Sequence, residues 1–410
     1  MRRTCSAPLF LILLALVPAL VAAPARAQTI TTAVPHALVM DAQSGTVLYE
    51  KGADDPVPPS SVAKLLAAEL VFRDLKKGAI TLDTPFYISE HAWKSAQGQT
   101  SMFARVNTSI RVEDLLRGMI VQHGNDAAIA LGEGLGGSEQ SFAAMMNVRA
   151  AEIGMGKSHF TDPWGGPDPA QIVTARDMAT LAQFIIRTYP EYYRYFGEKE
   201  FTWSKIRQLN RNPLLMDSEF GADGLTVGNM PGHGFNLVGS AVQNGQRLIV
   251  VVLDAAKSTE RAEEARRLFN WGFHGFETRT LFEAGAKVGA AKVFGGADSE
   301  APLVSEAPIR LMTPRGSSEK LSGKIVYTGP LIAPVEAGET VARLKIYRGA
   351  MLALDVPLKT GAAVEQGPLT QRAKDAALEL GLQLFHKGVS KAMHSLDRKP
   401  ETASAPATAP

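Results

Sequence analysis

The order in which strand and helix patterns follow one another restricts the fold of this chain most. Strand-like alternation appears at residues 36–49 and returns at 236–253, where Asn244-Gly245 is a strong hairpin turn. Between them the apolar residues follow helical spacing, at 62–75, 112–121, 125–133, 139–153 and 174–188, and a charged helix is expected at 258–273. The pattern therefore predicts an α+β domain whose sheet combines strands from both ends of the segment.

The chain changes character after about residue 280, and its 410 residues are too many for one average domain. Short strand-like runs at 308–312, 324–327, 340–347 and 351–358 predict a small all-β domain over 280–367. Residues 368–396 are helical in pattern and apolar on one side, which suits either a surface helix or an amphipathic helix lying on a membrane. The Ala/Pro/Thr-rich tail at 397–410 is expected to be disordered.

The first 27 residues read as a secretory signal peptide. Arg2 and Arg3 precede an apolar run at 8–23, and Ala25-Arg26-Ala27 is a small-x-small cleavage pattern; an uncleaved membrane anchor is the alternative. Removal of this segment takes away three arginines and Cys5, so the net charge changes from 43 − 41 = +2 to 40 − 41 = −1. An exported chain without cysteine excludes a disulfide framework and a cysteine-ligated metal site, and its charge argues against a nucleic-acid binder. No later stretch has the roughly 18 apolar residues of a membrane span.

The start of the helix at residue 62 carries the strongest chemical signal. Ser61 and Lys64 are three residues apart, so both side chains fall on one face of the first turn, for which Ser60 or Ser61 is a natural N-cap. A partly desolvated, neutral lysine can take the proton of a serine hydroxyl, and N–H groups at a helix start can bind the resulting oxyanion. The spacing alone is weakly specific, because Ser317 and Lys320 share it in a segment read as a solvated loop.

Two further motifs give this pair its context. His123-Gly124-Asn125 opens a helix, and Thr226-Val227-Gly228 stands just before a strand. In this order the chain resembles the D-alanyl-D-alanine carboxypeptidases among the low-molecular-mass penicillin-binding proteins, whose motifs are Ser-x-x-Lys, Ser-x-Asn and Lys-Thr-Gly. The resemblance extends to the intervening segments 115–119, 174–178 and 208–212 and covers nearly the whole chain. It implies a penicillin-binding, β-lactamase-like transpeptidase domain at 28–279, followed by the β domain and the terminal helix.

The resemblance also implies roles for the motif residues. Ser61 would be the acylated nucleophile and Lys64 its general base, and Asn125 would bind the substrate backbone and help to hold Lys64. The backbone N–H groups of Ser61 and Asn229 would form the oxyanion hole. The substrate would be the D-Ala-D-Ala end of a peptidoglycan stem peptide, with β-lactam antibiotics as acylating inhibitors and with no metal or organic cofactor. The expected location is the periplasm, with peripheral contact to the outer face of the inner membrane through residues 368–396.

Substrate binding would fall to Thr226, Gly228, Asn229 and Arg261. Arg261 resembles an arginine that the family uses early in the helix after the last strand pair; the alternative is a solvated arginine on the helix face. The segment 164–169 is expected to form a rigid loop at the cleft rim.

The chain departs from the family motifs at two places. His123 replaces the serine of the second motif; histidine can carry protons near neutral pH, but its bulk can also obstruct the site. Thr226 and Val227 replace the lysine and threonine of the third motif. Losing two charge-assisted hydrogen bonds costs about 3–6 kcal/mol, or roughly 10² to 10⁴ in rate. A catalytically weak or silent murein-binding relative is therefore the alternative to an active carboxypeptidase. A serine β-lactamase would share the motifs, but the β domain and the terminal helix argue against it.

Overall fold

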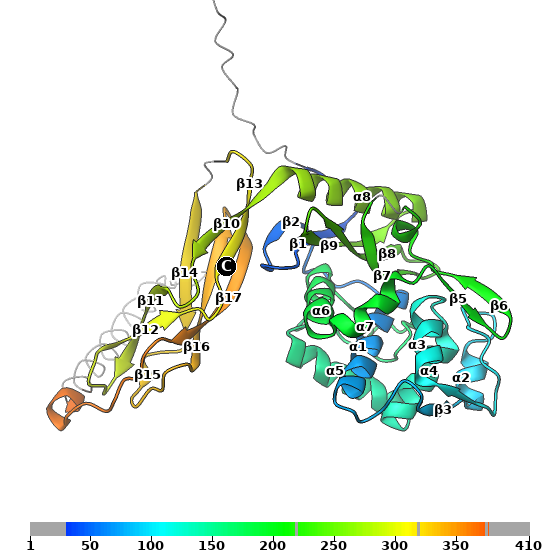
Figure 1. Cartoon of the computed structure of the whole chain (residues 1–410), viewed down its shortest axis with the longest axis horizontal. Coiled ribbons are helices and arrows are strands. Elements are labelled where there is room, and N and C mark those ends of the chain that lie inside the picture. The colour runs from blue at the N-terminus through cyan, green and yellow to red at the C-terminus, as the bar shows by residue number, and fades with distance from the viewer. Residues whose placement is uncertain (1–29, 218–219, 318–319, 374–375, 377–410) are drawn as a thin grey trace, which may run out of the picture.

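The computed structural model describes residues 30–217, 220–317, 320–373 and 376, which form two domains (Figure 1). The expected signal peptide and the expected disordered tail lie outside the described residues. Most of the expected terminal helix also lies outside the described residues. In its described part, residues 369–373 are helical. No helix within the described ranges has both the length and the hydropathy needed to cross a membrane.

The first domain is built on a five-stranded antiparallel sheet in the order β2-β1-β9-β8-β7. Strands from both ends of the domain thus lie in one sheet, as the sequence pattern predicts. Asn244 and Gly245 have φ values of 51° and 77°, the positive values that a tight hairpin turn requires. The strands of this sheet are β1 (His36–Asp41), β2 (Val47–Lys51), β7 (Ala222–Asn229), β8 (Phe235–Gln243) and β9 (Gln246–Ala255).

Helices cover both faces of this sheet. Along β9, Ile249, Val251 and Leu253 belong to the core beneath the helical part of the domain, whereas Leu248 and Val250 belong to the core under α8. Because successive strand residues point to opposite faces, a strand buried on both sides reads as one continuous apolar run. The helices are α1 (Lys64–Lys76), α2 (Glu90–Ser95), α3 (Val112–Ile120), α4 (Asn125–Gly136), α5 (Glu139–Ile153), α6 (Ala175–Thr188), α7 (Pro190–Tyr193) and α8 (Ser258–Gly275).

Shorter elements complete the first domain. Three 3-10 turns are η1 (Ser60–Ala63), η2 (Arg194–Gly197) and η3 (Pro213–Met216). Two small hairpins are formed by β3 (Pro85–Tyr87) with β4 (Ser109–Arg111), and by β5 (Glu200–Trp203) with β6 (Ile206–Leu209).

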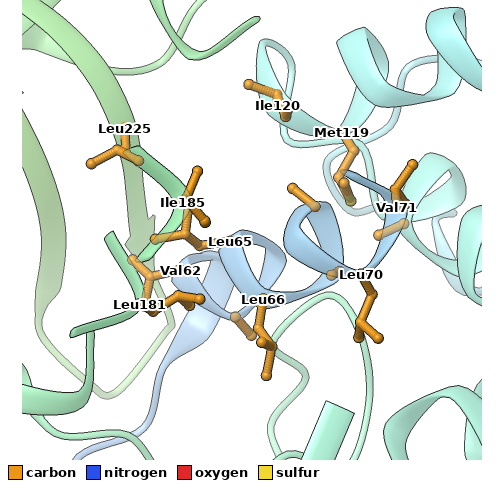
Figure 2. Close-up of a cluster of buried hydrophobic side chains, with 14 of the residues drawn as sticks. Val62, Leu65, Leu66, Leu70, Val71, Met119, Ile120, Leu181, Ile185 and Leu225 are labelled. Carbon is orange, nitrogen blue, oxygen red and sulfur yellow. The ribbon is translucent and has the colours of Figure 1, made fainter. Parts of the chain in front are cut away.

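Helix α1 runs through the middle of the helical core (Figure 2). Its apolar side chains Leu65, Leu66 and Leu70 are almost completely buried, and they pack in one cluster with residues of α3, α6 and β7. A helix surrounded in this way also buries its polar residues, among them Lys64 and Glu69. Lys64 is therefore withdrawn from water by the fold itself.

The second domain is all-β and follows α8 directly. Strand β10 begins at Phe276, four residues before the expected boundary at 280, because α8 ends at Gly275 and the chain continues straight into the strand. A six-stranded sheet has the order β14-β16-β17-β12-β11-β15, and β10 pairs with β13 in a separate ladder. The strands are β10 (Phe276–Phe282), β11 (Lys287–Phe294), β12 (Glu300–Val304), β13 (Ile309–Pro314), β14 (Leu321–Tyr327), β15 (Leu331–Ile332), β16 (Thr340–Arg348) and β17 (Met351–Thr360).

One local prediction is wrong. Neither Ser60 nor Ser61 caps a helix with its side chain, because both lie inside η1, whose own N-cap position is Pro59. The segment 226–228 precedes strand β8, as expected, and is itself part of strand β7, because its backbone pairs with residues 236–238 of β8.

Candidate active site

A cleft of about 570 Å³ opens where η1, the start of α4 and the end of β7 meet. It gathers residues from segments far apart in the sequence. Six of the eight residues expected in the site line it: Ser61, His123, Asn125, Gly228, Asn229 and Arg261. Lys64 lies behind Ser61 in the core and Thr226 is buried in strand β7, and neither of them lines the cleft.

Lys64 links three parts of the site. Its Nζ atom lies 3.1 Å from Ser61 Oγ, 2.8 Å from Asn125 Oδ1 and 2.8 Å from the carbonyl oxygen of Trp164. Burial disfavours the ammonium form and lowers the pKa of Lys64 to about 7, against the opposing charge of Asp162. Near neutral pH a large fraction of Lys64 is therefore an uncharged amine in contact with a serine hydroxyl.

The turn that carries Ser61 is held from two sides by close backbone approaches. Gly165 has a φ of 89°, and a Cβ there would lie 1.8 Å from the carbonyl oxygen of Ser60. A Cβ on Gly228 would lie 2.2 Å from Ser60 Oγ and 3.0 Å from the Ser61 nitrogen. Only glycine permits both contacts, so β7 and the loop at 164–166 lie directly against η1.

Asn236 of β8 ties the start of this turn to the sheet. Its amide nitrogen donates to the carbonyl oxygens of Pro58 and Pro59 at 3.0 Å each, and its Oδ1 accepts from the N–H of Asp254 at 2.9 Å. The carbonyl oxygens of Pro58 and Pro59 are acceptors, and a side chain from a strand far along the chain supplies their donor. The position of Ser61 is thus determined by β8 as well as by its own helix.

His123 and Asn125 enter the cleft from the turn between α3 and α4. His123 has a φ of 61° and is 4% exposed, and its Nε2 has no hydrogen-bond partner within the described parts of the chain. Burial, followed by the nearby charge of Lys64, holds the pKa of His123 well below its usual value. His123 is therefore a neutral imidazole at pH 7, with one ring nitrogen available.

Arg261 lies in the first turn of α8 and is 7% exposed. Its Nη1 lies 3.4 Å from the carbonyl oxygens of both Gly228 and Asn236, and its Nε has no partner among the residues described. Burial lowers its pKa to about 10, so the guanidinium keeps its charge at neutral pH. The reading of Arg261 as a solvated residue on a helix face is wrong, because α8 packs this turn onto the end of β7.

The third motif contributes little polarity. Thr226 is buried, and its hydroxyl lies 3.5 Å from the carbonyl oxygen of Val227, while Val227, which also lines the cleft, is buried in the hydrophobic cluster under α8. A threonine hydroxyl is attached to Cβ and stays close to its own strand, whereas a lysine ammonium is attached to Cε, three carbons farther from the backbone. The chain thus lacks a cation at this position of the cleft wall.

Sequence reasoning missed a second cation of the cleft. Arg211 lines the cleft, its Nε donates to the carbonyl oxygen of Gln122 at 2.9 Å, and burial lowers its pKa. Its segment, 208–212, resembles the family, but nothing in the residues alone marks this arginine as facing the site. The expected rim loop is confirmed, because Trp164, Gly165 and Pro167 line the cleft. Within the described ranges no three acidic, histidine or cysteine side chains are grouped to hold a metal ion.

Comparison with known proteins decides the family. Residues 22–257, more than half of the chain, match the family model described as D-alanyl-D-alanine carboxypeptidase. The chain belongs to the D-alanyl-D-alanine carboxypeptidase family. Residues 276–366 match the model described as penicillin-binding protein 5, C-terminal domain, in agreement with the all-β domain.

Relatives within this family resemble the chain over most of its length. D-alanyl-D-alanine carboxypeptidase DacC of Escherichia coli is 36% identical over 343 residues, 82% of this chain and 86% of that protein. The structure of penicillin-binding protein 5 from Haemophilus influenzae has a TM-score of 0.70 and 32% identity, and covers 82% of this chain and 99% of its own. Penicillin-binding protein D2 of Listeria monocytogenes, solved in its ampicillin-bound form, has a TM-score of 0.52 and 28% identity, covering 60% and 99%. These matches confirm the expected α+β fold and the carboxypeptidase class, and they do not favour the murein-binding alternative.

Proposed function

We propose that this protein is an exported serine-type D-alanyl-D-alanine carboxypeptidase that removes the terminal D-alanine of peptidoglycan stem pentapeptides through an acyl-enzyme on Ser61. One observation carries the proposal: the buried Lys64 amine contacts Ser61 Oγ and Asn125 Oδ1 beside an open cleft. A lysine with a pKa near 7 is a suitable general base at neutral pH.

In acylation, Lys64 takes the proton of the Ser61 hydroxyl while Oγ attacks the carbonyl carbon of the penultimate D-alanine. The carbonyl oxygen becomes an oxyanion, which the backbone N–H groups of Ser61 and Asn229 stabilise. The C–N bond then breaks and the departing amine takes up a proton, which leaves an ester on Ser61. Water hydrolyses this ester with Lys64 again as the base, and the serine hydroxyl is restored.

His123 is proposed to relay the proton to the departing amine. Its imidazole is neutral, lines the cleft and has an unpartnered Nε2, so it can hydrogen-bond to an amine held near Asn125. The serine of the family motif offers a hydroxyl at this place. A histidine extends farther into the cleft and leaves less room for substrate.

Arg261 is proposed to meet the terminal carboxylate of the substrate, with Gly228 and Asn229 beside it in the cleft wall. Its Nε is free of protein partners within the described residues, so it can donate to a ligand. The missing lysine and threonine of the third motif reduce this binding. We therefore expect an active enzyme that turns over slowly for its family, and slow acylation by β-lactams.

Release of D-alanine from a synthetic pentapeptide ending in D-Ala-D-Ala tests this function. We expect release by the mature protein, its loss in Ser61→Ala and its retention in Ser141→Ala, which removes the hydroxyl of an exposed serine in α5 away from the cleft as a control. A folded protein that binds murein and releases no D-alanine would contradict the proposal and favour the silent relative. Fast turnover of a chromogenic cephalosporin would instead favour a β-lactamase.

The proposed location is the periplasm, with peripheral attachment to the inner membrane through residues 368–396. The signal pattern at 1–27 and the apolar side of 368–396 support this. A chain ending at Gly367 is expected to leave the membrane fraction. If it fractionates with membranes as well as the full chain does, the segment is not an anchor.

A further inference from the structure

We propose that Asp162 is a positioning residue for catalysis, which acts on Lys64 through the turn that it holds at residues 164–166. The inference rests on the proposed role of Lys64 as general base. Asp162 does not line the cleft that contains Ser61, and it belongs to none of the three family motifs.

One carboxylate holds the whole turn. Asp162 Oδ1 accepts from the backbone N–H groups of Trp164 at 2.8 Å and Gly165 at 2.7 Å, and Oδ2 accepts from Gly166 N–H at 3.0 Å. The side chain of Gln171 donates to Oδ2 at 2.9 Å and fixes the carboxylate from the other side. Backbone donors on a charged acceptor make strong, short hydrogen bonds, so the turn is rigid.

The turn presents a carbonyl oxygen to the base. Trp164 O accepts from Lys64 Nζ at 2.8 Å, and the indole N–H of Trp164 donates to Glu139 at 3.0 Å. Gly165 lies against Ser60, so the turn cannot approach η1 more closely. The hydrogen bonds to Asp162 and Glu139 and the contact with Ser60 thus fix the position of the Trp164 carbonyl.

This carbonyl directs the lone pair of Lys64. A neutral amine has two N–H bonds and one lone pair. Asn125 Oδ1 and Trp164 O are both acceptors, so they take the two N–H bonds, and the lone pair is left to face Ser61 Oγ at 3.1 Å. Without the Trp164 carbonyl in place, the amine can rotate and offer an N–H to the serine instead. A base that is poorly aligned with its proton loses rate steeply.

The charge of Asp162 acts on Lys64 as well. Burial lowers the pKa of Lys64, and the charge of Arg211 lowers it as well. The charge of Asp162 raises this pKa and is the largest opposing influence, and Asp126 also raises it. His123, whose pKa is lowered further by the charges of Lys64, Arg211 and Arg261, is neutral chiefly because of its own burial. Removing the Asp162 charge should therefore lower the Lys64 pKa further and weaken the base.

Two variants separate geometry from charge. Asp162→Asn keeps an oxygen acceptor for the turn and removes the charge, whereas Asp162→Ala removes both. Asp168→Asn is the matched control, because Asp168 lies in the same loop and accepts from the N–H of Ala170, with no contact to Lys64.

The first readout is the titration midpoint of Lys64 by NMR in full-length protein carrying ¹³Cε-labelled lysine, with the signal assigned by its loss in Lys64→Met. The second is the pH profile of acylation by a fluorescent penicillin.

We expect the Lys64 midpoint and the acidic limb of acylation to fall by at least about half a pH unit in Asp162→Asn, and to stay unchanged in Asp168→Asn. In Asp162→Ala we expect acylation to slow by about 10- to 100-fold at every pH. An unchanged midpoint in Asp162→Asn together with full acylation by Asp162→Ala would overturn the inference. If the wild-type protein is not acylated at all, the proposed function fails, and the NMR titration still decides whether Asp162 acts on Lys64.

Discussion

At the scale of single residues, the site depends on one buried lysine. A lysine inside a core is costly unless it is uncharged or well partnered, and Lys64 is held by three hydrogen bonds at a pKa near 7. The same burial that destabilises its ammonium form makes it a base at neutral pH. In the proposed mechanism, function and stability therefore oppose one another at this residue.

This balance predicts the pH dependence of acylation. Lys64 is protonated below pH 7 and neutral above it, so the rate should rise with pH, about tenfold per unit well below the pKa and then level off. The measurement is the rate of acylation by a fluorescent penicillin between pH 5 and 9. Lys64→Arg, which stays charged throughout, should remove acylation at every pH. A flat profile across pH 6–8 would argue against Lys64 as the base.

The apolar third motif gives a second prediction at this scale. Val227→Thr keeps the side-chain shape and adds the hydroxyl that the family motif carries at this place. One neutral hydrogen bond is worth about 0.5–1.5 kcal/mol, so we expect kcat/KM for a D-Ala-D-Ala peptide to rise by roughly 2- to 12-fold. Val47→Thr, in β2 and away from the cleft, serves as the control for a buried valine-to-threonine change. No gain in Val227→Thr would show that the motif change does not limit binding.

At the scale of elements, glycine contacts place η1, the turn that carries Ser61. The sequence predicts the helix at 62–75 and both hairpins well, because apolar periodicity and turn residues are local signals. It does not predict that Gly165 and Gly228 press two distant segments against Ser60. Nor does it predict the burial of Arg261 or the place of Arg211, because both depend on how α8 and the segment before η3 pack around the end of β7. These features depend on long-range packing, which the spacing of residues along the sequence does not reveal.

Gly165→Ala tests the close approach. The variant adds a Cβ that would lie 1.8 Å from the Ser60 carbonyl oxygen, so the turn must move away from η1. Gly154→Ala is the matched control, because Gly154 has a similar φ of 96° and nothing within 4 Å of its Cβ position. In both variants an alanine at positive φ lowers the free energy of unfolding by about 1–2 kcal/mol, which lowers the midpoint of thermal unfolding. Only Gly165→Ala should also slow acylation, by tenfold or more. Equal acylation by the two variants would contradict the packing described for this turn.

At the scale of the whole molecule, the two domains share part of one hydrophobic core. Met312 of β13 is fully buried within the hydrophobic cluster of the first domain. Its backbone N–H donates to Thr46 Oγ1 at 3.3 Å, and its carbonyl oxygen accepts from Arg348 at 2.7 Å. The β domain is therefore joined to the sheet of the first domain by packing as well as by the covalent passage from α8 to β10. Neither composition nor the strand patterns after residue 280 predict this contact.

Met312→Ala should loosen this junction without altering the site. Truncating a buried methionine costs about 2–5 kcal/mol, which urea unfolding would detect. Leu354→Ala, inside the core of the β domain itself, serves as the comparison. We expect Met312→Ala, and not Leu354→Ala, to increase proteolytic cleavage between the domains, with acylation of Ser61 retained in both. Loss of acylation in Met312→Ala would show that the junction supports the cleft.

The central claim is that Ser61 is the nucleophile of this carboxypeptidase, and mass spectrometry of the protein after incubation with penicillin tests it most directly. We expect a single covalent adduct that peptide mapping places on Ser61 and that is absent from Ser61→Ala. A folded protein that remains unmodified at saturating penicillin, or an adduct on another residue, would contradict the account.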